Sequence, residues 1–344
     1  MIARTAHPAP EDLPVWRLLN LGSCEPVRAQ GFAEAVAPSV GRGDVPNTLL
    51  VVRTETPFVS LGFHQSYEEE IDPAFLDRHH IPVFRRVEGG GTAYLDSGQL
   101  LYYLVYRTAL RSGGGPSDLP RFLAGPLHAA RSQGLAAEIR PPSDLTVGGR
   151  KISGNSGGDW ADAHLIAGDL LGRTDHRAMA DLFRLPHPAL RSLLRREVRR
   201  WLTSWEGETG GPPDWKALTA ALIEGFRAAG LFRLEPDRAT AEEEHYFRAE
   251  TVPHHYDRSW RDLPASSTPA GRLRRRIRVA GPHGLMVLDG TARGELSIGI
   301  VEGSELREAY LVGPGSTGGL RAIPIGGRIG ADFQKEIRKV PGFG

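Results

Sequence analysis

Short apolar segments separated by glycine, proline and polar residues run through roughly the first 260 positions, and they predict a protein in which strands and helices alternate. Strands are predicted at residues 15–19, 48–53, 59–63, 81–86, 100–107 and 165–171. Segment 100–107 is almost unbroken in apolar character, which is typical of a strand buried on both faces. The β-branched segments 48–53 and 59–63 are expected to be neighbouring strands.

Helical patterns lie between and after these strands. One covers residues 26–37, where Pro38 is expected to close the helix, and another covers residues 67–80, whose acidic start and basic end suit the helix dipole. Further helices are predicted at residues 119–134, 177–183, 189–205 and 215–229. Residues 144–147 and 151–153 are expected to pair as a hairpin that turns at Gly148 and Gly149.

The last quarter of the chain has a different pattern. Residues 263–269 are rich in proline and serine and are predicted to be a linker. Strand patterns follow at residues 273–279, 285–289, 295–301 and 308–312, separated by turns that contain glycine. We therefore expect a large domain over residues 1–262 and a small α+β domain over residues 263–344.

Composition excludes several classes of protein. One cysteine, Cys24, allows neither an internal disulfide framework nor a zinc cluster built from cysteines. No run of about 18 apolar residues could cross a bilayer, and the first residues lack the apolar core of a secretion signal. The formal net charge of +1 gives no general reason to bind nucleic acid or membranes. We expect a cytoplasmic protein that is a monomer.

Basic residues are almost all arginine, because only four of the 42 are lysine: Lys151, Lys216, Lys335 and Lys339. Lys151 stands inside the glycine-rich segment Gly149-Arg150-Lys151-Ile152-Ser153-Gly154. A lysine is a compact, movable cation, and here it could stabilise the charge that builds when a carboxylate attacks the α-phosphate of ATP. A surface lysine in a salt bridge, left by a strong arginine bias, is the alternative.

A second glycine-rich segment, Arg85-Arg86-Val87-Glu88-Gly89-Gly90-Gly91, follows a predicted strand. Three glycines without side chains allow a ligand to approach the backbone, whose N–H groups can bind a carboxylate or phosphate. Arg86 could direct a planar cation to the same place. The turn is neither a nucleotide-hydrolase phosphate loop nor a dinucleotide fingerprint, since no Gly-Lys-Ser/Thr and no helix follows it. A tight turn without any ligand is equally compatible with the three glycines.

Together the two segments resemble those of the lipoate-protein ligases, which have Arg-Arg-x-Ser/Thr-Gly-Gly-Gly followed about fifty residues later by Asn-Asp-Leu and Gly-Arg-Lys-Ile-Ser-Gly. The matching residues are 85–99 and 143–155, and fainter agreement extends from about residue 15 to residue 262. The chain departs from the family pattern at Glu88, Leu95 and Ser143, where the family has Ser or Thr, His and Asn. The tail after residue 264 resembles the accessory domain of such ligases.

The resemblance implies an α/β fold of the α+β type, with a central mixed β-sheet flanked by helices, as in biotin and lipoate ligases. It implies an ATP-dependent enzyme that uses Mg²⁺, converts lipoate to lipoyl-AMP and transfers the lipoyl group to a lysine of a carrier protein. Such carriers are lipoyl domains of 2-oxoacid dehydrogenase E2 subunits, the glycine cleavage H protein or a related lipoate-binding protein.

The same resemblance implies which residues form the site. Lys151 would be the catalytic residue, in contact with the lipoyl carbonyl and the phosphate oxygens. Asp144 is a candidate Mg²⁺ ligand, although one carboxylate does not define a metal site. Lipoate and ATP would be bound by Arg86, Gly89, Gly90, Gly91, Thr92, Tyr94, Asp96, Ser143, Asp144, Lys151, Ser153, Gly154 and Gly168.

Four alternatives stay open at this point. Octanoyl and lipoyl transferases of the same fold form a thioester on cysteine without ATP, but Cys24 is remote in sequence from both glycine-rich segments. A biotin ligase would carry a different basic loop. A non-catalytic lipoate-binding relative is compatible with the departures from the family pattern. Nucleic-acid binding would rest on arginine clusters at residues 195–200 and 272–278, which are better explained as solvated faces.

Overall fold

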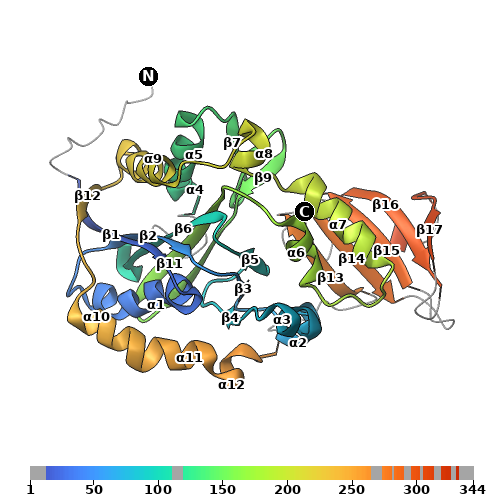
Figure 1. The fold of residues 1–344 in the computed structure, drawn as a ribbon, viewed down its shortest axis with the longest axis horizontal. Coiled ribbons are helices and arrows are strands. Elements are labelled where there is room, and N and C mark those ends of the chain that lie inside the picture. Colours follow the sequence, from blue (N-terminus) through green and yellow to red (C-terminus); the bar gives the residue numbers. More distant parts are fainter. Residues whose placement is uncertain are drawn as a thin grey trace.

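The computed structural model describes residues 13–110, 119–264, 273–280, 283–289, 296–302, 305–313, 319–326 and 331–332. Its centre is a six-stranded sheet with the order β10-β11-β6-β2-β1-β12 (Figure 1). The sheet is mixed, because β1 pairs parallel with β2 and β12 whereas the other neighbours pair antiparallel. Its strands are β1 (Val15–Cys24), β2 (Thr48–Thr54), β6 (Gln99–Arg107), β10 (Asn155–Trp160), β11 (Ala163–Leu171) and β12 (Arg233–Pro236). The expected central mixed sheet is confirmed.

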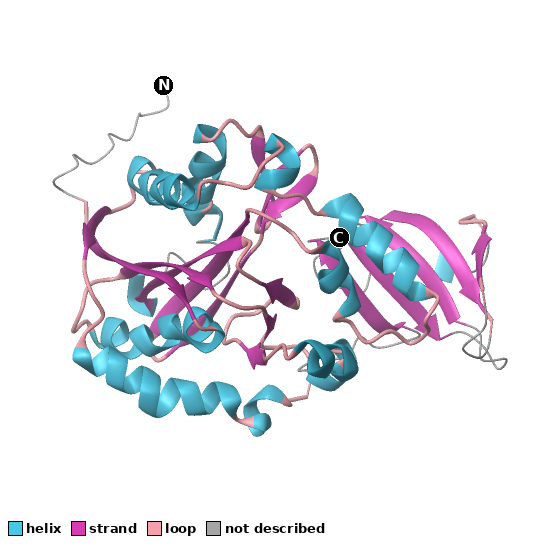
Figure 2. Ribbon diagram, in the orientation of Figure 1, coloured by secondary structure: helices cyan, strands magenta, loops and turns pink. Residues whose placement is uncertain are grey.

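Helices cover both faces of this sheet (Figure 2). Successive side chains of a strand point to opposite faces, so neighbouring tyrosines of β6 enter different layers. The hydroxyl of Tyr103 donates to the carbonyl of Ala29 in α1 (2.9 Å), while the ring of Tyr102 packs against Phe226 of α9, with 5.6 Å between centroids. The first layer contains α1 (Pro26–Arg42), α10 (Ala241–Tyr246), the π-helical turn η4 (Phe247–Thr251), α11 (Val252–Tyr256) and α12 (Arg258–Arg261).

The opposite layer is built from α5 and α9, which pack against each other. The predicted helix over residues 119–134 is two helices that meet at Leu123, and the predicted helix over 189–205 ends at Trp201. A new helix then begins, because the Ser204 hydroxyl accepts a hydrogen bond from the N–H of Gly207 and caps it. The helices after β6 are η2 (Thr108–Leu110), α4 (Leu119–Phe122), α5 (Ala124–Ser132), α6 (His176–Asp181), α7 (Leu190–Trp201), α8 (Trp205–Thr209) and α9 (Trp215–Ala228).

Proline acts differently at two places from what the sequence predicted. Helix α1 does not close at Pro38 but runs on to Arg42 and ends at Gly43, whose φ of 80° is left-handed. Burial of most of α1 outweighs the one backbone hydrogen bond that a proline removes. In contrast, the predicted helix 67–80 is broken before Pro73 into α2 (Tyr67–Glu70) and α3 (Pro73–His79), since the residue before a proline favours extended backbone.

A small three-stranded sheet carries the first glycine-rich segment. It has the order β4-β3-β5, with β3 (Phe58–Leu61) between β4 (Val83–Arg85) and β5 (Ala93–Leu95). The prediction that segment 59–63 lies beside segment 48–53 is therefore wrong. The chain turns away after β2, and the N–H of Val59 donates instead to the carbonyl of Pro82 (2.9 Å).

The predicted hairpin is confirmed. β8 (Asp144–Val147) and β9 (Arg150–Ser153) pair antiparallel in a second small sheet, which β7 (Ala137–Arg140) completes. Gly148 and Gly149 join them with φ angles of 55° and 76°, both in the left-handed region that a two-residue hairpin turn requires.

The described part of the tail is a five-stranded antiparallel sheet in sequential order. It lies beside α7, which packs against β13 and β14 (Figure 1). Most of the predicted linker, residues 265–269, lies outside the described residues. Division of the chain into domains at residue 263 stays a prediction. The strands are β13 (Leu273–Ala280), β14 (His283–Asp289), β15 (Leu296–Glu302), β16 (Glu305–Val312) and β17 (Leu320–Ile323).

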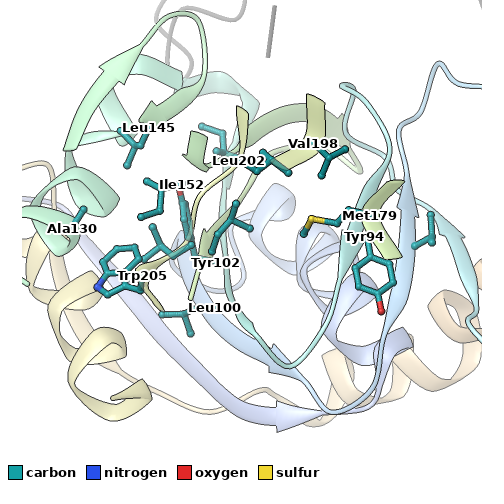
Figure 3. Packing of buried hydrophobic residues seen from close by; sticks show 14 of the residues in the cluster. Tyr94, Leu100, Tyr102, Ala130, Leu145, Ile152, Met179, Val198, Leu202 and Trp205 are labelled. Atoms are coloured by element: carbon teal, nitrogen blue, oxygen red, sulfur yellow. The ribbon is translucent and has the colours of Figure 1, made fainter. Parts of the chain in front are cut away.

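Two apolar clusters lie on the two sides of the central sheet. Figure 3 shows part of the larger one, in which Met179 of α6 lies close to Tyr94 of β5, with Val198 and Leu202 beyond them. Within the described ranges, no helix combines the length and the apolar character needed to cross a membrane.

Candidate active site

A cavity of about 230 Å³ lies between the first glycine-rich turn and the β8–β9 hairpin. Most of the residues predicted from the sequence line it, although they come from distant parts of the chain. They are Arg86, Gly90, Gly91, Thr92, Tyr94, Ser143, Asp144, Lys151, Gly154 and Gly168. Apolar side chains of α6 and α7, among them Met179 and Val198, complete the wall (Figure 3). A larger cavity of about 380 Å³, between β2 and α9, is lined by none of the predicted residues.

Lys151 is held by both its backbone and its side chain. Its carbonyl accepts a hydrogen bond from the N–H of Thr203 (2.9 Å), which ties the hairpin to the end of α7. Its ammonium lies 2.8 Å from Oδ1 of Asp144, and the guanidinium of Arg140 contacts Oδ2 of the same carboxylate at 3.1 Å. Burial raises the pKa of Asp144, but the two cations outweigh burial and the pKa is lowered. Asp144 is therefore ionised and orients the lysine.

Gly154 leaves the space that the lysine side chain occupies. A Cβ at this position would lie 2.6 Å from Nζ of Lys151, closer than a real contact allows. The N–H of Gly154 donates to Oδ1 of Asp169 at 2.6 Å, so a second carboxylate lies near the ammonium. Burial raises the pKa of Asp169, whereas Lys151 and this N–H oppose the rise. A side chain at Gly154 would therefore displace the tip of Lys151 from this position.

Arg86 is bound to the glycine turn more than it is directed into the cavity. One terminal nitrogen donates to the carbonyl (2.9 Å) and hydroxyl (3.2 Å) of Ser60, and the other donates to the carbonyls of Gly89 (2.7 Å) and Gly91 (2.8 Å). Four of its five N–H groups are engaged in this way. Gly90, at the apex, has a φ of 91°. Arg86 therefore lines the cavity while fixing the turn's shape.

Arg85, the other arginine of the motif, points away from the cavity. Its side chain is fully buried and donates to the carbonyls of Trp260 (2.9 Å), Arg261 (2.8 Å) and Leu263 (2.8 Å). The indole N–H of Trp260 returns a hydrogen bond to the carbonyl of Arg85 (2.9 Å). A cation suits the carbonyls at the end of a helix. Arg85 thereby anchors the end of α12 to the small sheet.

Three of the predicted residues do not line the cavity. The N–H of Gly89 donates to the carbonyl of Gly157 (3.1 Å), and the hydroxyl of Ser153 lies 3.4 Å from the side-chain amide of Asn155. Asp96 lies in the turn between β5 and β6, where its Oδ1 accepts the N–H of Gly98 (2.7 Å). Gly89 and Asp96 thus hold neighbouring backbone, and Ser153 contacts the side chain of Asn155.

Several lining residues were not predicted. Asn155 donates to the carbonyl of Ser143 (2.8 Å), and Asp169, Tyr103 and Gln30 also face the cavity. Asn155 ends the lysine motif and Asp169 follows Gly168, so proximity in sequence was an available signal for these two. Gln30 and Tyr103 carry no such signal, because they reach the cavity only through the packing of α1 on β6.

The residues that the structure describes contain no group of three or more His, Cys, Asp or Glu side chains placed to hold a metal ion. Asp144, the candidate Mg²⁺ ligand, uses its two oxygens for Lys151 and Arg140. The geometry does not fit a metal ion held by the protein alone. Mg²⁺ can instead arrive with nucleotide phosphates, which supply most of its ligands in many enzymes.

The chain's single thiol is not among the groups that line the cavity. Cys24 is the last residue of β1, and its side chain does not line the cavity. Burial raises the pKa of its thiol to about 11, and the neighbouring Arg28 only partly opposes this. Only a small fraction of this thiol is the reactive thiolate at neutral pH.

Glu88 stands where the family pattern has Ser or Thr, and it is buried beside the turn, where its Oε2 has no hydrogen-bond partner among the residues that the structure describes. Burial, with help from Glu34, raises its pKa to about 7 from 4.5. A carboxyl whose folded-state pKa is raised stabilises the fold at low pH, and this contribution is lost as the pH rises from about 4.5 to 7.

We expect the Glu88→Gln variant to gain stability relative to the wild type as the pH rises. The difference in unfolding free energy between the two proteins should shift by about 3 kcal/mol in favour of the variant between pH 4.5 and pH 8. The amide removes the cost of ionising a buried carboxyl. Urea unfolding at several pH values measures this change, with Glu55→Gln on an exposed site as the control. A stability difference that is constant across pH would contradict the shifted pKa.

The matches to known proteins include a family model whose matched range contains both glycine-rich segments. The sequence model of the family described as lipoyl protein ligase A/B catalytic domain matches residues 25–227, more than half of the chain. The octanoyltransferase LipM of Kyrpidia tusciae is 27% identical over 255 residues, which cover 67% of this chain and 93% of that protein. Lipoate–protein ligase 1 of Staphylococcus aureus is 33% identical over 100 residues, which cover 29% of this chain and 30% of that protein.

Solved structures share the fold. A bipartite lipoate protein ligase from Thermoplasma acidophilum superposes with a TM-score of 0.66 at 23% identity, covering 74% of this chain and all of that one. Lipoate-protein ligase A bound with ATP gives a TM-score of 0.60 at 24% identity, covering 71% of this chain and 97% of that one. The resemblance seen in the sequence is confirmed: the chain belongs to the lipoyl protein ligase A/B catalytic domain family, whose members act in lipoyl and octanoyl transfer.

Proposed function

We propose that the chain is an ATP-dependent lipoate–protein ligase that forms an acyl-adenylate. The observation that carries this proposal is a cavity in which an oriented lysine, Lys151, is present while the chain's one thiol, Cys24, is elsewhere. Acyl transfer without ATP by this fold would need a cysteine that holds the acyl group as a thioester. Activation as an adenylate needs no nucleophile from the protein.

The proposed reaction has two steps. The carboxylate of lipoate attacks the α-phosphorus of ATP, pyrophosphate leaves, and lipoyl-AMP forms. The amine of a carrier lysine then attacks the lipoyl carbonyl, an amide bond forms, and AMP leaves with the bonding electrons. Lys151 would stabilise the extra negative charge on the phosphate and carbonyl oxygens in both steps, as a fixed cation in a partly buried site can. Mg²⁺ would enter with ATP.

Other residues of the proposed site would orient the substrates. Asp144 fixes Lys151, and Arg86 fixes the glycine turn whose backbone at Gly90 and Gly91 faces the cavity. Orientation of this kind contributes much of the rate when two bound substrates react. The carrier would be a lipoyl domain of a 2-oxoacid dehydrogenase or a similar protein, in keeping with the E2 lipoyl domain that the Thermoplasma ligase accompanies.

Transfer of an octanoyl group without ATP is the second candidate. Three relatives that align with this chain in sequence over 93%, 92% and 91% of their own length are octanoyltransferases, which favours this reaction. The position and raised pKa of Cys24 argue against a thioester at that residue.

An acylation assay decides between the two candidates. Wild-type protein and the Cys24→Ser variant are each given lipoate or octanoate together with a lipoyl domain. We expect acylation of the carrier to require ATP, to release AMP, and to proceed at the same rate in both proteins within about twofold. Mass spectrometry of the carrier and an AMP assay measure this. Transfer from an octanoyl-carrier without ATP, abolished in Cys24→Ser, would overturn the ligase proposal.

A further inference from the structure

A second carboxylate faces the cavity beside Lys151. Asp169, on β11, lines the cavity and is partly exposed. Alternate side chains of a strand share a face, and Ala167, Asp169 and Leu171 all line the cavity from β11. Among the described residues of the cavity wall, only Asp144 and Asp169 carry a carboxylate. The two proposed steps use Asp144 and give no role to Asp169.

The carboxylate of Asp169 is held in place by Gly154. The N–H of Asp169 donates to the carbonyl of Gly154 (3.1 Å), and the N–H of Gly154 donates to Oδ1 of Asp169 (2.6 Å). A Cβ on Gly154 would lie 2.6 Å from Nζ of Lys151 and 3.6 Å from Oδ1 of Asp169, so the two charged groups approach one point. Oδ2 of Asp169 accepts no hydrogen bond from another described residue and keeps some exposed surface. One oxygen is thus fixed, and the other is open to a substrate.

The charge of Asp169 is not needed to orient Lys151. Asp144 already binds Lys151 at 2.8 Å and contacts Arg140 through its other oxygen at 3.1 Å. A further carboxylate at this place repels the phosphates of a nucleotide but attracts a cation. The carrier brings such a cation, because an ordinary lysine side chain is protonated at neutral pH. The charge of Asp169 therefore suits the carrier's lysine.

The carrier's lysine cannot attack until it loses a proton, since the ammonium has no free electron pair. At neutral pH the ammonium exceeds the amine by about 10³-fold. A general base removes such a proton most effectively when its pKa is close to the working pH. Burial raises the pKa of Asp169 above its ordinary value, although Lys151 and the N–H of Gly154 oppose the rise. The other charged or titratable groups that act on Asp169 electrostatically are Asp144, Arg86 and Tyr102.

Other groups in the described part of the cavity wall suit this role poorly. Both oxygens of Asp144 are engaged by cations. The phenols of Tyr94 and Tyr103 have pKa values that burial raises, so at neutral pH they are protonated and cannot accept the proton as phenolates. Asp169 is the group that combines an open acceptor oxygen with a position beside Lys151.

We propose that Asp169 is the general base of the transfer step, and that its Oδ2 takes the proton that the carrier's lysine must lose. The proposal rests on the ligase function proposed above and adds a catalytic group to its second step. The freed amine attacks the carbonyl carbon of lipoyl-AMP, a C–N bond forms, and the C–O bond to the phosphate breaks. AMP leaves with that electron pair, and a second proton passes from the nitrogen to a phosphate oxygen of AMP. Asp169 then gives its proton to water.

The variant Asp169→Asn tests the proposal, because its amide oxygen can still accept the N–H of Gly154 but the side chain is no longer a base. Pyrophosphate release from lipoate and ATP measures adenylation. Carrier mass measures transfer when synthetic lipoyl-AMP and a lipoyl domain are given to the full-length protein. We expect adenylation to stay near the wild-type rate and transfer at pH 7.5 to fall about 10²-fold. The deficit should shrink to less than about tenfold at pH 9.5, because the free amine becomes more abundant as the pH rises.

Two further variants serve as controls. Asp159→Asn removes an exposed carboxylate of the neighbouring strand β10 that does not line the cavity, and it should change neither step. In Asp169→Ala, added formate is expected to restore part of the transfer rate, because a small carboxylate can occupy the space of the missing one. Thermal unfolding establishes which variants are folded. If Asp169→Asn is unfolded, formate rescue of Asp169→Ala decides, and unfolding of both would assign Asp169 a structural role and refute the proposal.

Three results contradict the proposal. Equal losses of adenylation and transfer in Asp169→Asn, or a transfer deficit that is the same at both pH values, would mean that Asp169 only holds Gly154 and Lys151 in place. Unchanged transfer would remove Asp169 from the reaction. Failure of the ligase function is distinguishable, because wild-type protein that releases no pyrophosphate still shows the effect of Asp169 with supplied lipoyl-AMP. Wild-type protein that transfers nothing from lipoyl-AMP overturns the assignment of Asp169, whatever the pyrophosphate assay gives.

Discussion

Replacing Lys151 with alanine is expected to lower the rate of AMP release with lipoate and ATP by about 10²- to 10³-fold, the usual cost of removing one preorganised charge-stabilising donor. The lysine is oriented by Asp144 at 2.8 Å and fits against Gly154, so its loss leaves no other ammonium at this place within the described part of the chain. Binding of lipoate should weaken much less, because the charge that Lys151 offsets is largest in the transition state. Steady-state AMP release and lipoate titration measure the two effects.

Two further variants make this result specific. Lys216→Ala, at an exposed position at the start of α9, removes a lysine without touching the proposed site and should leave the rate unchanged. Lys151→Arg should not restore activity, since a planar guanidinium cannot place a compact ammonium at the position that Lys151 holds beside Asp144. Wild-type turnover in Lys151→Ala would remove the lysine from the proposed mechanism.

Replacing Glu243 with alanine is expected to lower the free energy of unfolding by about 3–5 kcal/mol, the typical effect of removing one member of a buried ion pair. Glu243 of α10 is 1% exposed and binds both terminal nitrogens of Arg17 in β1, which is 2% exposed. Its carboxylate also accepts the hydroxyl of Ser39 (2.8 Å) and the N–H of Thr240 (2.8 Å). Its loss leaves a buried guanidinium largely uncompensated. Chemical denaturation measures the change.

The preceding residue provides the matched control. Glu242 lies in the same helical turn but is exposed, and it pairs with Arg42 at 2.6 Å on the surface. Glu242→Ala should cost less than about 1 kcal/mol, because exposed ion pairs are weak. Equal losses in the two variants would mean that helix α10 itself, and not the buried pair, accounts for the stability.

Local chemistry could be predicted from the sequence. The hairpin followed from two adjacent glycines between strand patterns, and the position of Lys151 on it followed from counting residues. The buried strand β6 followed from its unbroken apolar run. In each case the deciding interactions are within a few residues of each other, so a pattern in the sequence reports on them directly.

Longer-range roles could not be predicted. Arg86 was expected to face a ligand, but whether its N–H groups meet a ligand or the turn depends on the position of Ser60 in another strand. Gln30 was in a helix that the sequence did predict, yet its place on the cavity wall depends on how α1 lies over β6 and β11. The continuation of α1 through Pro38 depends likewise on burial that local propensity does not describe.

Helix α7 belongs to two parts of the molecule at once. Its Val198 lines the cavity, while Arg196 contacts Glu308 of the tail sheet at 2.7 Å. Binding of an acid in the cavity and packing of the tail sheet therefore both depend on the position of α7. By thermodynamic linkage, a bound acid that shifts α7 changes the affinity of the sheet for the helix, and loosening the sheet changes the affinity for the acid by the same factor.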